Sequence, residues 1–190
     1  MARPTPLRDR APHIQAAITV LGRMPGADKR ARGWLARVDL IGSELGHSDL
    51  AEADLHYSDL SHSFLMRADL RRADLTGVWF VRAILDGTRL HQADLRSAVL
   101  WRARPKGADL RATDLTGADF TGARLQGARL DLADLRAADF STTDLAGATF
   151  RGALADDTTI WPEGFDPQQA GVLPADTAPP FRPQSYSEDL

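Results

Sequence analysis

A five-residue rhythm constrains this chain more than any other feature of its sequence. At residue numbers divisible by five from 40 to 150, 22 of 23 positions are Leu or Phe, and the exception is Pro105. Two residues before each of these centres the side chain is small: 14 are Ala, four are Ser and three are Thr, leaving only Val38 and Val78. The position between the two is Asp in 13 of 23 repeats. A unit of small residue, Asp and large apolar residue therefore recurs without a slip in register.

This unit predicts short extended segments joined by corners. In an extended chain, residues two apart point to the same face, so the small and large residues share one face and Asp takes the other. Because five is odd, a straight strand would bury every second Asp, and the chain must turn within each repeat. The second position after the centre suits such a turn, since Gly tolerates positive φ. It is Gly at nine places: Gly42, Gly77, Gly87, Gly107, Gly117, Gly122, Gly127, Gly147 and Gly152.

Short segments with regular corners form a coil, and stacked coils bond to one another like neighbouring strands. A long amphipathic helix is the competing interpretation. It is disfavoured because apolar residues five apart rotate by about 500° per step and do not form a stripe on a helix. The rhythm therefore predicts an all-β solenoid filled with Leu, Phe and Ala.

The segments "ADLRATDL", "ADFTGARL" and "ADLRAADF" resemble the pentapeptide-repeat family, whose pattern is A-(D/N)-L-x-x. The resemblance covers about residues 35 to 160. It implies a right-handed quadrilateral β-helix with four pentapeptides, or twenty residues, in each coil. The span then holds about six coils and forms a rod of roughly 30 Å.

The ends of the chain differ from the repeats, and a solenoid needs closed ends. We expect residues 1–34 to form an N-terminal arm with a short capping helix, because Ile14, Ile18 and Leu21 follow helical spacing. A membrane-surface helix is the alternative. Residues 35–160 form the β-helix. Residues 161–190 contain six Pro and no repeat; we expect them to give a C-terminal cap with Trp161 and Phe165, then a flexible tail from 174.

Composition bounds the function. The chain has 23 basic and 26 acidic side chains and a net charge of −3, which does not favour direct nucleic-acid binding. It has no Cys, which fits a reducing compartment, and no long apolar run that would span a membrane. We expect a cytoplasmic protein.

The sequence offers no catalytic constellation, cofactor motif or metal motif. Ser43, in "GSELG", occupies a small inward position and is interpreted as a core residue. His47, His56, His62 and His91 fall in outward or corner positions of different sides, so a shared metal site is not expected. We expect neither an enzyme nor a cofactor.

Residues twenty apart should stack on the same side of the coil. This predicts an acidic ladder on one side, formed by Asp54, Asp74, Asp94, Asp114 and Asp134. Such Asp side chains have a structural explanation, bonding to nearby backbone and neutralisation by Arg71, Arg72, Arg96, Arg111 and Arg136. The resemblance implies a second explanation, which is functional: some pentapeptide-repeat proteins bind DNA gyrase by imitating duplex DNA with an acidic rod.

Two features depart from those gyrase-binding proteins. They are commonly dimers joined through a C-terminal module, whereas this chain ends in a Pro-rich segment, so a monomer is favoured. The position that is usually Asp is basic at Arg89, Arg104, Arg124 and Arg129, which makes an acidic surface patchy.

A second surface breaks the repeat pattern. The segments "VWFVRAIL" and "AVLW" place apolar residues where polar ones are usual, and the twenty-residue coil brings them to one corner. This predicted partner-binding patch consists of Phe64, Trp79, Val81, Ile84, Val99 and Trp101, with Met66 nearby. The alternative is that a terminal segment of the chain covers it.

The sequence thus predicts a non-enzymatic β-solenoid that binds another protein. The leading specific hypothesis is interaction with a type II topoisomerase, DNA gyrase, by partial DNA mimicry. The alternative is a structural or scaffold protein that binds an unidentified partner through the apolar patch.

Overall fold

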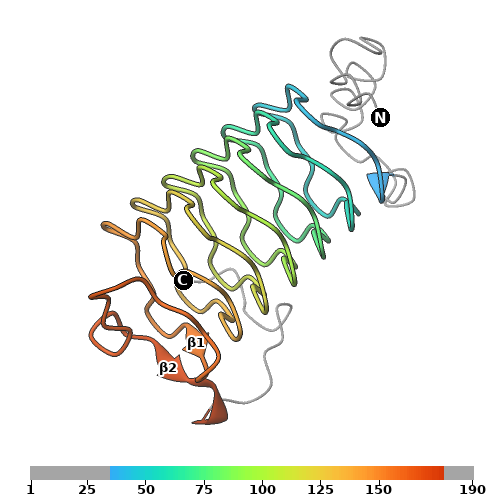
Figure 1. The fold of residues 1–190 in the computed structure, drawn as a ribbon. Helices are drawn as coiled ribbons and strands as arrows, with labels where there is room; N and C mark the ends of the chain where they lie inside the picture. Colours follow the sequence, from blue (N-terminus) through green and yellow to red (C-terminus); the bar gives the residue numbers. More distant parts are fainter. Residues whose placement is uncertain (1–34, 178–190) are drawn as a thin grey trace, which may run out of the picture.

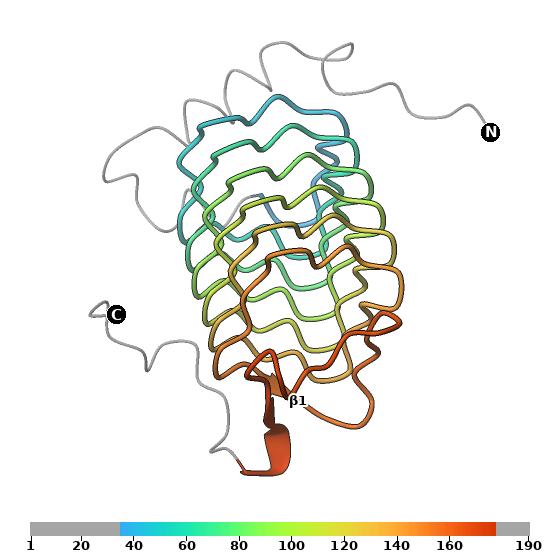
Figure 2. The same cartoon turned by 90° about the vertical axis from the view of Figure 1, so that its left-hand side faces the viewer.

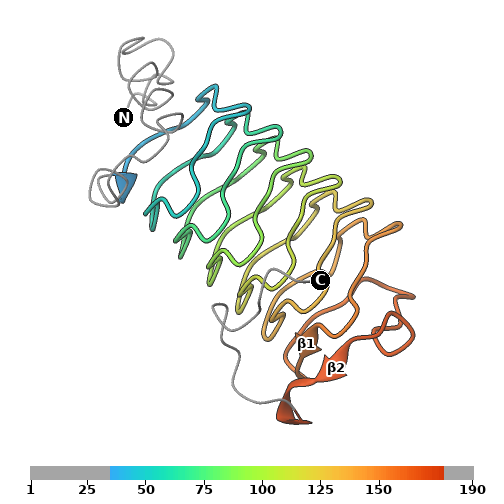
Figure 3. The same cartoon turned by 180° about the vertical axis from the view of Figure 1, so that it is seen from behind.

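The computed structural model describes residues 35–177, which form a stack of coils (Figure 1). Outward residues pair through parallel bridges with residues twenty positions further on, as Asp39 pairs with Asp59 and Asp59 with Trp79. This spacing confirms twenty-residue coils of four pentapeptides each. The turned views show the same coil-on-coil arrangement along the whole rod (Figures 2 and 3).

The four sides of the coil are numbered here in chain order by their outward residues. Side 1 carries positions 39, 59, 79, 99, 119 and 139; side 2 carries 44, 64, 84, 104, 124 and 144; side 3 carries 49, 69, 89, 109, 129 and 149; side 4 carries 54, 74, 94, 114, 134 and 154.

Each pentapeptide turns through the same corner. The carbonyl of the centre residue accepts the N–H of the residue three positions on, as Leu40 does from Ser43 at 3.1 Å. The second corner residue has positive φ, as in a type II turn. All nine predicted Gly positions have it, and so do 14 other corner residues, including Tyr57 with a φ of 55°. The Gly pattern alone therefore underestimates how regular the corners are.

Hydrogen bonds between coils compensate for this backbone strain. In one repeat, Leu55 N–H donates to the Asp74 carbonyl at 2.8 Å, and Tyr57 N–H donates to the Thr76 carbonyl at 2.8 Å. In the other direction, Asp74 N–H donates to the Ala53 carbonyl at 2.9 Å. A left-handed conformation costs a non-Gly residue about 1–2 kcal/mol, and the corner N–H bond to the next coil helps to hold it.

The core consists of the centre and small residues, as the rhythm predicts. Leu75, Leu95 and Leu115 are fully buried, and so are the small residues that precede them, such as Ala93. Burial of each Leu side chain contributes about 1.5–3 kcal/mol. Ser43 is also fully buried, which confirms its interpretation as a core residue.

Pro105 interrupts the ladder on side 2. Bridges join Ile84 to Arg104 and Arg124 to Asp144, but within residues 35–177 no bridge joins Arg104 to Arg124. The reason is that Pro105, at a centre position, has no N–H to donate to the next coil. Its carbonyl still accepts the corner bond from Ala108 at 3.1 Å, so the turn is kept while one rung is lost.

One extra residue shifts the register in the last coil. Asp139 pairs with Ile160, twenty-one positions on, so Ile160 points outward and is 51% exposed. Trp161 takes the centre position in its place and stacks on Phe140. Phe165 in turn stacks on Trp161, with ring centroids 4.9 Å apart. These two aromatic rings lie against the end of the core.

The chain then returns to add a short strand. β1 (Leu154–Ala155) pairs in parallel with β2 (Leu173–Pro174), and the 3₁₀ helix η2 (Ala175–Thr177) follows. Ordered structure therefore continues past the expected start of the tail at 174. The expected capping helix and the rest of the tail fall on residues 1–34 and 178–190, outside the described part of the chain.

Candidate protein-binding surface

The structure brings the predicted apolar residues together at the corner between sides 1 and 2. We call Phe64, Trp79, Val81, Ile84, Val99 and Trp101 the corner patch. Trp79 bridges to Val99 on side 1, and Phe64 bridges to Ile84 on side 2. Val81 and Trp101 lie between these pairs, each one residue after a buried centre. The two coils are joined at this corner by Arg82 N–H, which donates to the Trp101 carbonyl at 3.0 Å.

The corner patch is open to solvent at its edge. Trp79 is 55% exposed and Met66, next to the patch, is 45% exposed, while Phe64, Ile84 and Trp101 are half-buried. Large exposed apolar side chains on neighbouring coils are unusual for a surface whose repeat places polar residues outward.

Two arginines contact the aromatic part of the corner patch. The guanidinium carbon of Arg102 lies 4.3 Å from the centre of the Trp101 ring, and that of Arg82 lies 5.8 Å from it. Both distances suit cation–π interaction, which contributes about 0.5–1 kcal/mol at an exposed site.

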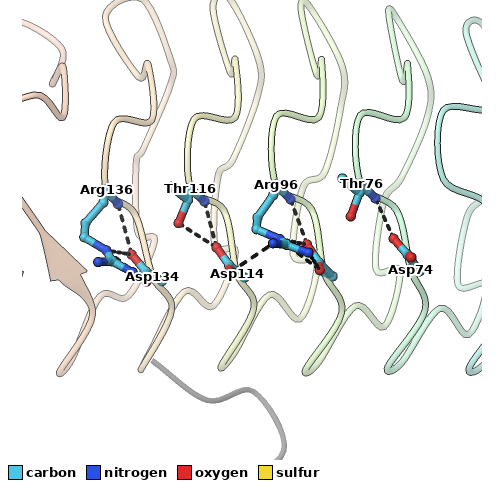
Figure 4. Close-up of polar contacts among 8 residues, drawn as sticks. Asp74, Thr76, Arg96, Asp114, Thr116, Asp134 and Arg136 are labelled. Atoms are coloured by element: carbon cyan, nitrogen blue, oxygen red, sulfur yellow. Dashed lines mark hydrogen bonds and ion pairs between the residues drawn. The ribbon is translucent and has the colours of Figure 1, made fainter. Parts of the chain in front are cut away.

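The acidic ladder also forms as predicted, on side 4. Bridges join Asp54 to Asp74, Asp74 to Asp94, Asp94 to Asp114 and Asp114 to Asp134. Figure 4 shows the ladder from Asp74 to Asp134 with the side chains that bind its members.

A local hydrogen bond explains why Asp recurs in the repeat. The Oδ1 atom accepts the backbone N–H two residues on, at the first corner position, as Asp74 does from Thr76 at 3.0 Å. This Asx turn satisfies a corner N–H that the ladder does not use. All 13 Asp residues of the repeat make it: Asp39, Asp49, Asp54, Asp59, Asp69, Asp74, Asp94, Asp109, Asp114, Asp119, Asp134, Asp139 and Asp144.

Arginines neutralise much of side 4. Arg96 Nε donates to Asp94 Oδ1 at 2.9 Å and also lies 3.9 Å from Asp114 Oδ2. Arg136 Nε donates to Asp134 Oδ1 at 2.8 Å. Burial raises the pKa of Asp114, and the charges of Asp134 and Asp94 raise it further, against hydrogen bonds from Thr116 that lower it.

Side 3 alternates in charge from Asp69 to Arg129, because Arg89 and Arg129 stand where the repeat usually has Asp. Arg89 Nη2 lies 2.9 Å from Asp69 Oδ2 in the preceding coil, and Arg71 Nε donates to Asp69 Oδ1 at 2.9 Å. Burial alone would raise the pKa of Asp69, but the bonds from Arg71 and the charges of Arg71 and Arg89 outweigh it and lower this pKa. Burial would likewise raise the pKa of Asp109, but the hydrogen bonds from Arg111 and the charges of Arg111 and Arg129 outweigh it and lower this pKa.

The Asp–Arg pairs follow a sequence signal that the stacking of residues twenty apart does not reveal. Arg follows Asp by two residues in the tetrapeptide Ala-Asp-Leu-Arg, and this spacing places the guanidinium on the carboxylate across the corner. The pairs are Asp69–Arg71, Asp94–Arg96, Asp109–Arg111 and Asp134–Arg136.

The four histidines of the repeats, His47, His56, His62 and His91, lie at four different corners, as their positions in the repeat predict. The structure adds one group that their spacing did not indicate, because Asp74 arrives from the next coil. His56 Nδ1 is hydrogen-bonded to Asp54 Oδ1, and ligand atoms of Asp54, His56 and Asp74 lie within 4.8 Å of one another. These side-chain types can ligate a divalent cation.

The coils and their outward columns define a β-solenoid that presents sides and corners as its binding surfaces. The family model described as pentapeptide repeats (8 copies) matches residues 35–72, 48–87, 65–102, 88–127 and 113–152. These overlapping matches span more than half of the chain. The protein therefore belongs to the pentapeptide-repeat family.

Solved structures of the same family resemble the chain. The pentapeptide repeat protein alr5209 from Nostoc PCC 7120 is 27% identical over 80% of this chain and 98% of its own, with a TM-score of 0.48. HetL from Nostoc sp. strain PCC 7120, a pentapeptide repeat protein involved in heterocyst differentiation regulation, is 34% identical over 62% of this chain and 63% of its own, with a TM-score of 0.32.

QnrB1, a plasmid-mediated fluoroquinolone resistance protein, is 19% identical over 74% of this chain and 76% of its own, with a TM-score of 0.37. A search of curated proteins found no match. In residues 35–177 no helix has the length and apolar character needed to cross a bilayer.

Proposed function

We propose that this protein is a non-enzymatic solenoid that binds another protein through the corner patch. The observation that carries the proposal is the pair Trp79 and Trp101 on adjacent coils, where Trp79 remains 55% exposed. Neither residue follows the repeat, so the fold does not require them. Aromatic side chains are enriched among the residues that dominate binding energy, with losses of about 2 kcal/mol or more on truncation.

The Asp residues need no such explanation. Each Asp of the repeat accepts a corner N–H, and several also bind Arg, so the acidic ladder has a structural role. This contrast favours the corner patch over side 4 as the partner surface.

The second candidate is DNA gyrase, or another type II topoisomerase, bound by partial DNA mimicry. The observation that favours it is the unbroken column of five carboxylates on side 4. Arg96 and Arg136 reduce its negative charge, and Arg89 does the same on side 3. The mimicry would therefore involve mainly the N-terminal end of the acidic ladder, Asp54 and Asp74.

The test uses retention of a partner from a lysate of the source organism. A variant with Trp79→Ser and Trp101→Ser should lose the retained protein and keep its melting temperature. Tyr57→Ser is the matched control, since Tyr57 is also an exposed aromatic residue, 59% exposed, at another corner. A variant with Asp74→Asn, Asp94→Asn and Asp114→Asn should retain the partner within a few-fold.

Other outcomes would change the conclusion. If the Asn variant loses the partner and the Trp variant keeps it, DNA mimicry replaces the corner patch, and inhibition of gyrase supercoiling by the purified protein should follow. A large fall in melting temperature in the Trp variant would show that the chain itself covers the patch.

A further inference from the structure

The corner patch lies in basic surroundings. Residues 59–67, 79–87 and 99–107 form the three coil segments that carry it. They contain five basic side chains and two acidic ones: Arg67, Arg82, Arg102, Arg104, Lys106, Asp59 and Asp86. The chain as a whole has a small acidic excess, so this local charge differs in sign from the average. Arg104 pairs with Asp86 at 3.0 Å, which leaves four basic groups against Asp59, at the edge of these segments.

Arg82 and Arg102 differ from the arginines of sides 3 and 4. Arg96 and Arg136 follow an Asp by two residues and bind its carboxylate. Arg82 and Arg102 stand one position later in the corner, three residues after Trp79 and Val99, and neither of these side-1 residues is acidic. Among residues 35–177, no carboxylate pairs with Arg82 or Arg102, and their guanidinium groups lie on Trp101.

A guanidinium that stacks on an aromatic ring keeps its N–H donors in its own plane, at the edge of the guanidinium group, where a carboxylate can accept two of them. The corner therefore combines two groups of recognition elements. Arg82 and Arg102 offer bidentate donors for carboxylates, and Trp79 with Val99 offers an apolar surface directly beside them.

Aspartates limit this surface along the rod. On side 1, the column runs from Asp59 through Trp79 and Val99 to Asp119. Three coil steps separate the two Asp residues, which is about 14 Å at the spacing of neighbouring strands. A long uniform polyanion would meet a negative charge at both ends, whereas a short segment would lie between them.

We propose that the partner docks a short acidic segment on the corner patch. Its carboxylates bind Arg82 and Arg102, and an apolar side chain next to them packs on Trp79 and Val99. This inference rests on the proposed function and specifies the chemistry of the partner. A protein segment fits better than a nucleic acid, because the apolar side chains of Phe64, Ile84 and Val99 lie on the two sides that meet at this corner. Asp59 and Asp119 also bound the surface along the rod.

The experiment uses the full-length protein and fluorescently labelled 12-residue peptides. The acidic probe carries four Glu, two Leu and one Phe in a Gly-Ser background; a second peptide has Gln in place of Glu, and a third has Lys. A 12-base-pair DNA duplex is the fourth probe. We expect the acidic peptide to bind at least about ten-fold more tightly than the Gln peptide at low salt, with the difference reduced when NaCl is raised to about 0.5 M.

Substitution separates the two recognition elements. Arg82→Gln with Arg102→Gln should lower affinity for the acidic peptide to that of the Gln peptide. Arg124→Gln with Arg151→Gln is the matched control, because it removes the same charge from exposed positions outside the patch, and it should change affinity by less than about two-fold. Circular dichroism and melting temperature should stay unchanged in both variants.

Each contrary result has a distinct meaning. Equal binding of the acidic and Gln peptides, lost in the variant with Trp79→Ser and Trp101→Ser, would overturn carboxylate recognition and keep the corner patch as an apolar binding surface. Tighter binding of the DNA duplex than of the acidic peptide would overturn the protein-segment proposal. Absence of binding by all four probes would also overturn it, while partner retention from lysate would still test the proposed function separately.

Discussion

Trp161 stacks nearly parallel on Phe140, with ring centroids 5.2 Å apart and an angle of 11° between the ring planes. The contact exists because the extra residue in the last coil turns Ile160 outward and moves Trp161 into the centre position. Phe150 meets the same Trp161 ring edge-on, with centroids 5.7 Å apart. The end of the core is thus closed by a ring system that continues its apolar stack.

The positions of Trp161 and Ile160 predict that substituting these adjacent residues has unequal effects on stability. Trp161→Ala should destabilise the protein by about 2–4 kcal/mol, because it removes a large side chain from the end of the core. Ile160→Ala is the matched control and should have an effect of less than about 1 kcal/mol, since Ile160 points outward. Thermal and urea unfolding of both variants measure this. The reverse order would show that the register does not shift in the last coil.

The missing rung predicts locally faster amide exchange. Residues 101–107 should exchange their amide hydrogens faster than residues 110–140, because Pro105 donates no bond to the next coil. Pro105→Leu should restore the rung and slow this exchange, with a gain in stability of about 1 kcal/mol. Hydrogen exchange followed by mass spectrometry resolves the segments. Uniform protection of the wild-type rod would contradict the prediction.

The pKa shifts of Asp69 and Asp114 have opposite directions, so their contributions to stability should depend on pH in opposite ways. The pKa of Asp69 is lower in the folded protein than its ordinary value of 3.8, so its charge stabilises the fold above that value and this contribution is lost as pH falls through the folded pKa. The pKa of Asp114 is raised, so its contribution is favourable when protonated and is lost as pH rises from 3.8 through the folded pKa.

Substitution by Asn keeps an oxygen for the Asx turn and removes the charge. Asp69→Asn should therefore destabilise the protein at pH 7, and the difference from wild type should shrink below about pH 4. Asp114→Asn should have the opposite sign, being neutral or stabilising at pH 7. Urea unfolding between pH 3 and pH 7 measures both variants. Equal effects of the two substitutions at pH 7 would contradict the assigned environments.

Gly77 and Gly107 have similar backbone conformations, but only Gly77 lies beside an aromatic ring, so an Ala substitution should have different effects on stability at the two positions. Gly77 and Gly107 have φ values of 61° and 63°, so an Ala at either position has about the same backbone strain. A Cβ atom at Gly77 would overlap the ring of Tyr57 at Cε1, whereas nothing lies within 4 Å of a Cβ atom at Gly107. Gly77→Ala should therefore destabilise the protein more than Gly107→Ala does.

The ring of Tyr57 is exposed and has room to move, which should keep the additional loss to about 1 kcal/mol or less. Adding Tyr57→Ser to each Gly variant should remove the difference between them. Melting temperatures of the four variants measure this comparison, and a persistent difference would assign it to the backbone.

The repeat determines most of what could be predicted from this sequence. Leu95 and Ala93 point inward because the five-residue register leaves no other arrangement, and counting by twenty placed Trp79 beside Val99. The shift at Ile160 could not be predicted, because Ile at a multiple of five continues the apparent rhythm although the chain has gained one residue. The Asp94–Arg96 pair depends on how far the Arg side chain reaches across a corner, which the stacking of residues twenty apart does not determine.

Twenty-residue coils make surface position depend on chain length in quarter turns. Inserting one pentapeptide between Leu85 and Leu95 would keep every later Leu inward, because the core treats all four sides alike. It would nevertheless carry Val99 and Trp101 around to the next side, away from Trp79 and Val81. Inserting four pentapeptides there would leave every later residue on its own side and only separate the two coils along the axis. An insertion of one or of four pentapeptides thus leaves the core pattern equally intact. Its length nevertheless decides whether the two tryptophans stay on the same side of the rod.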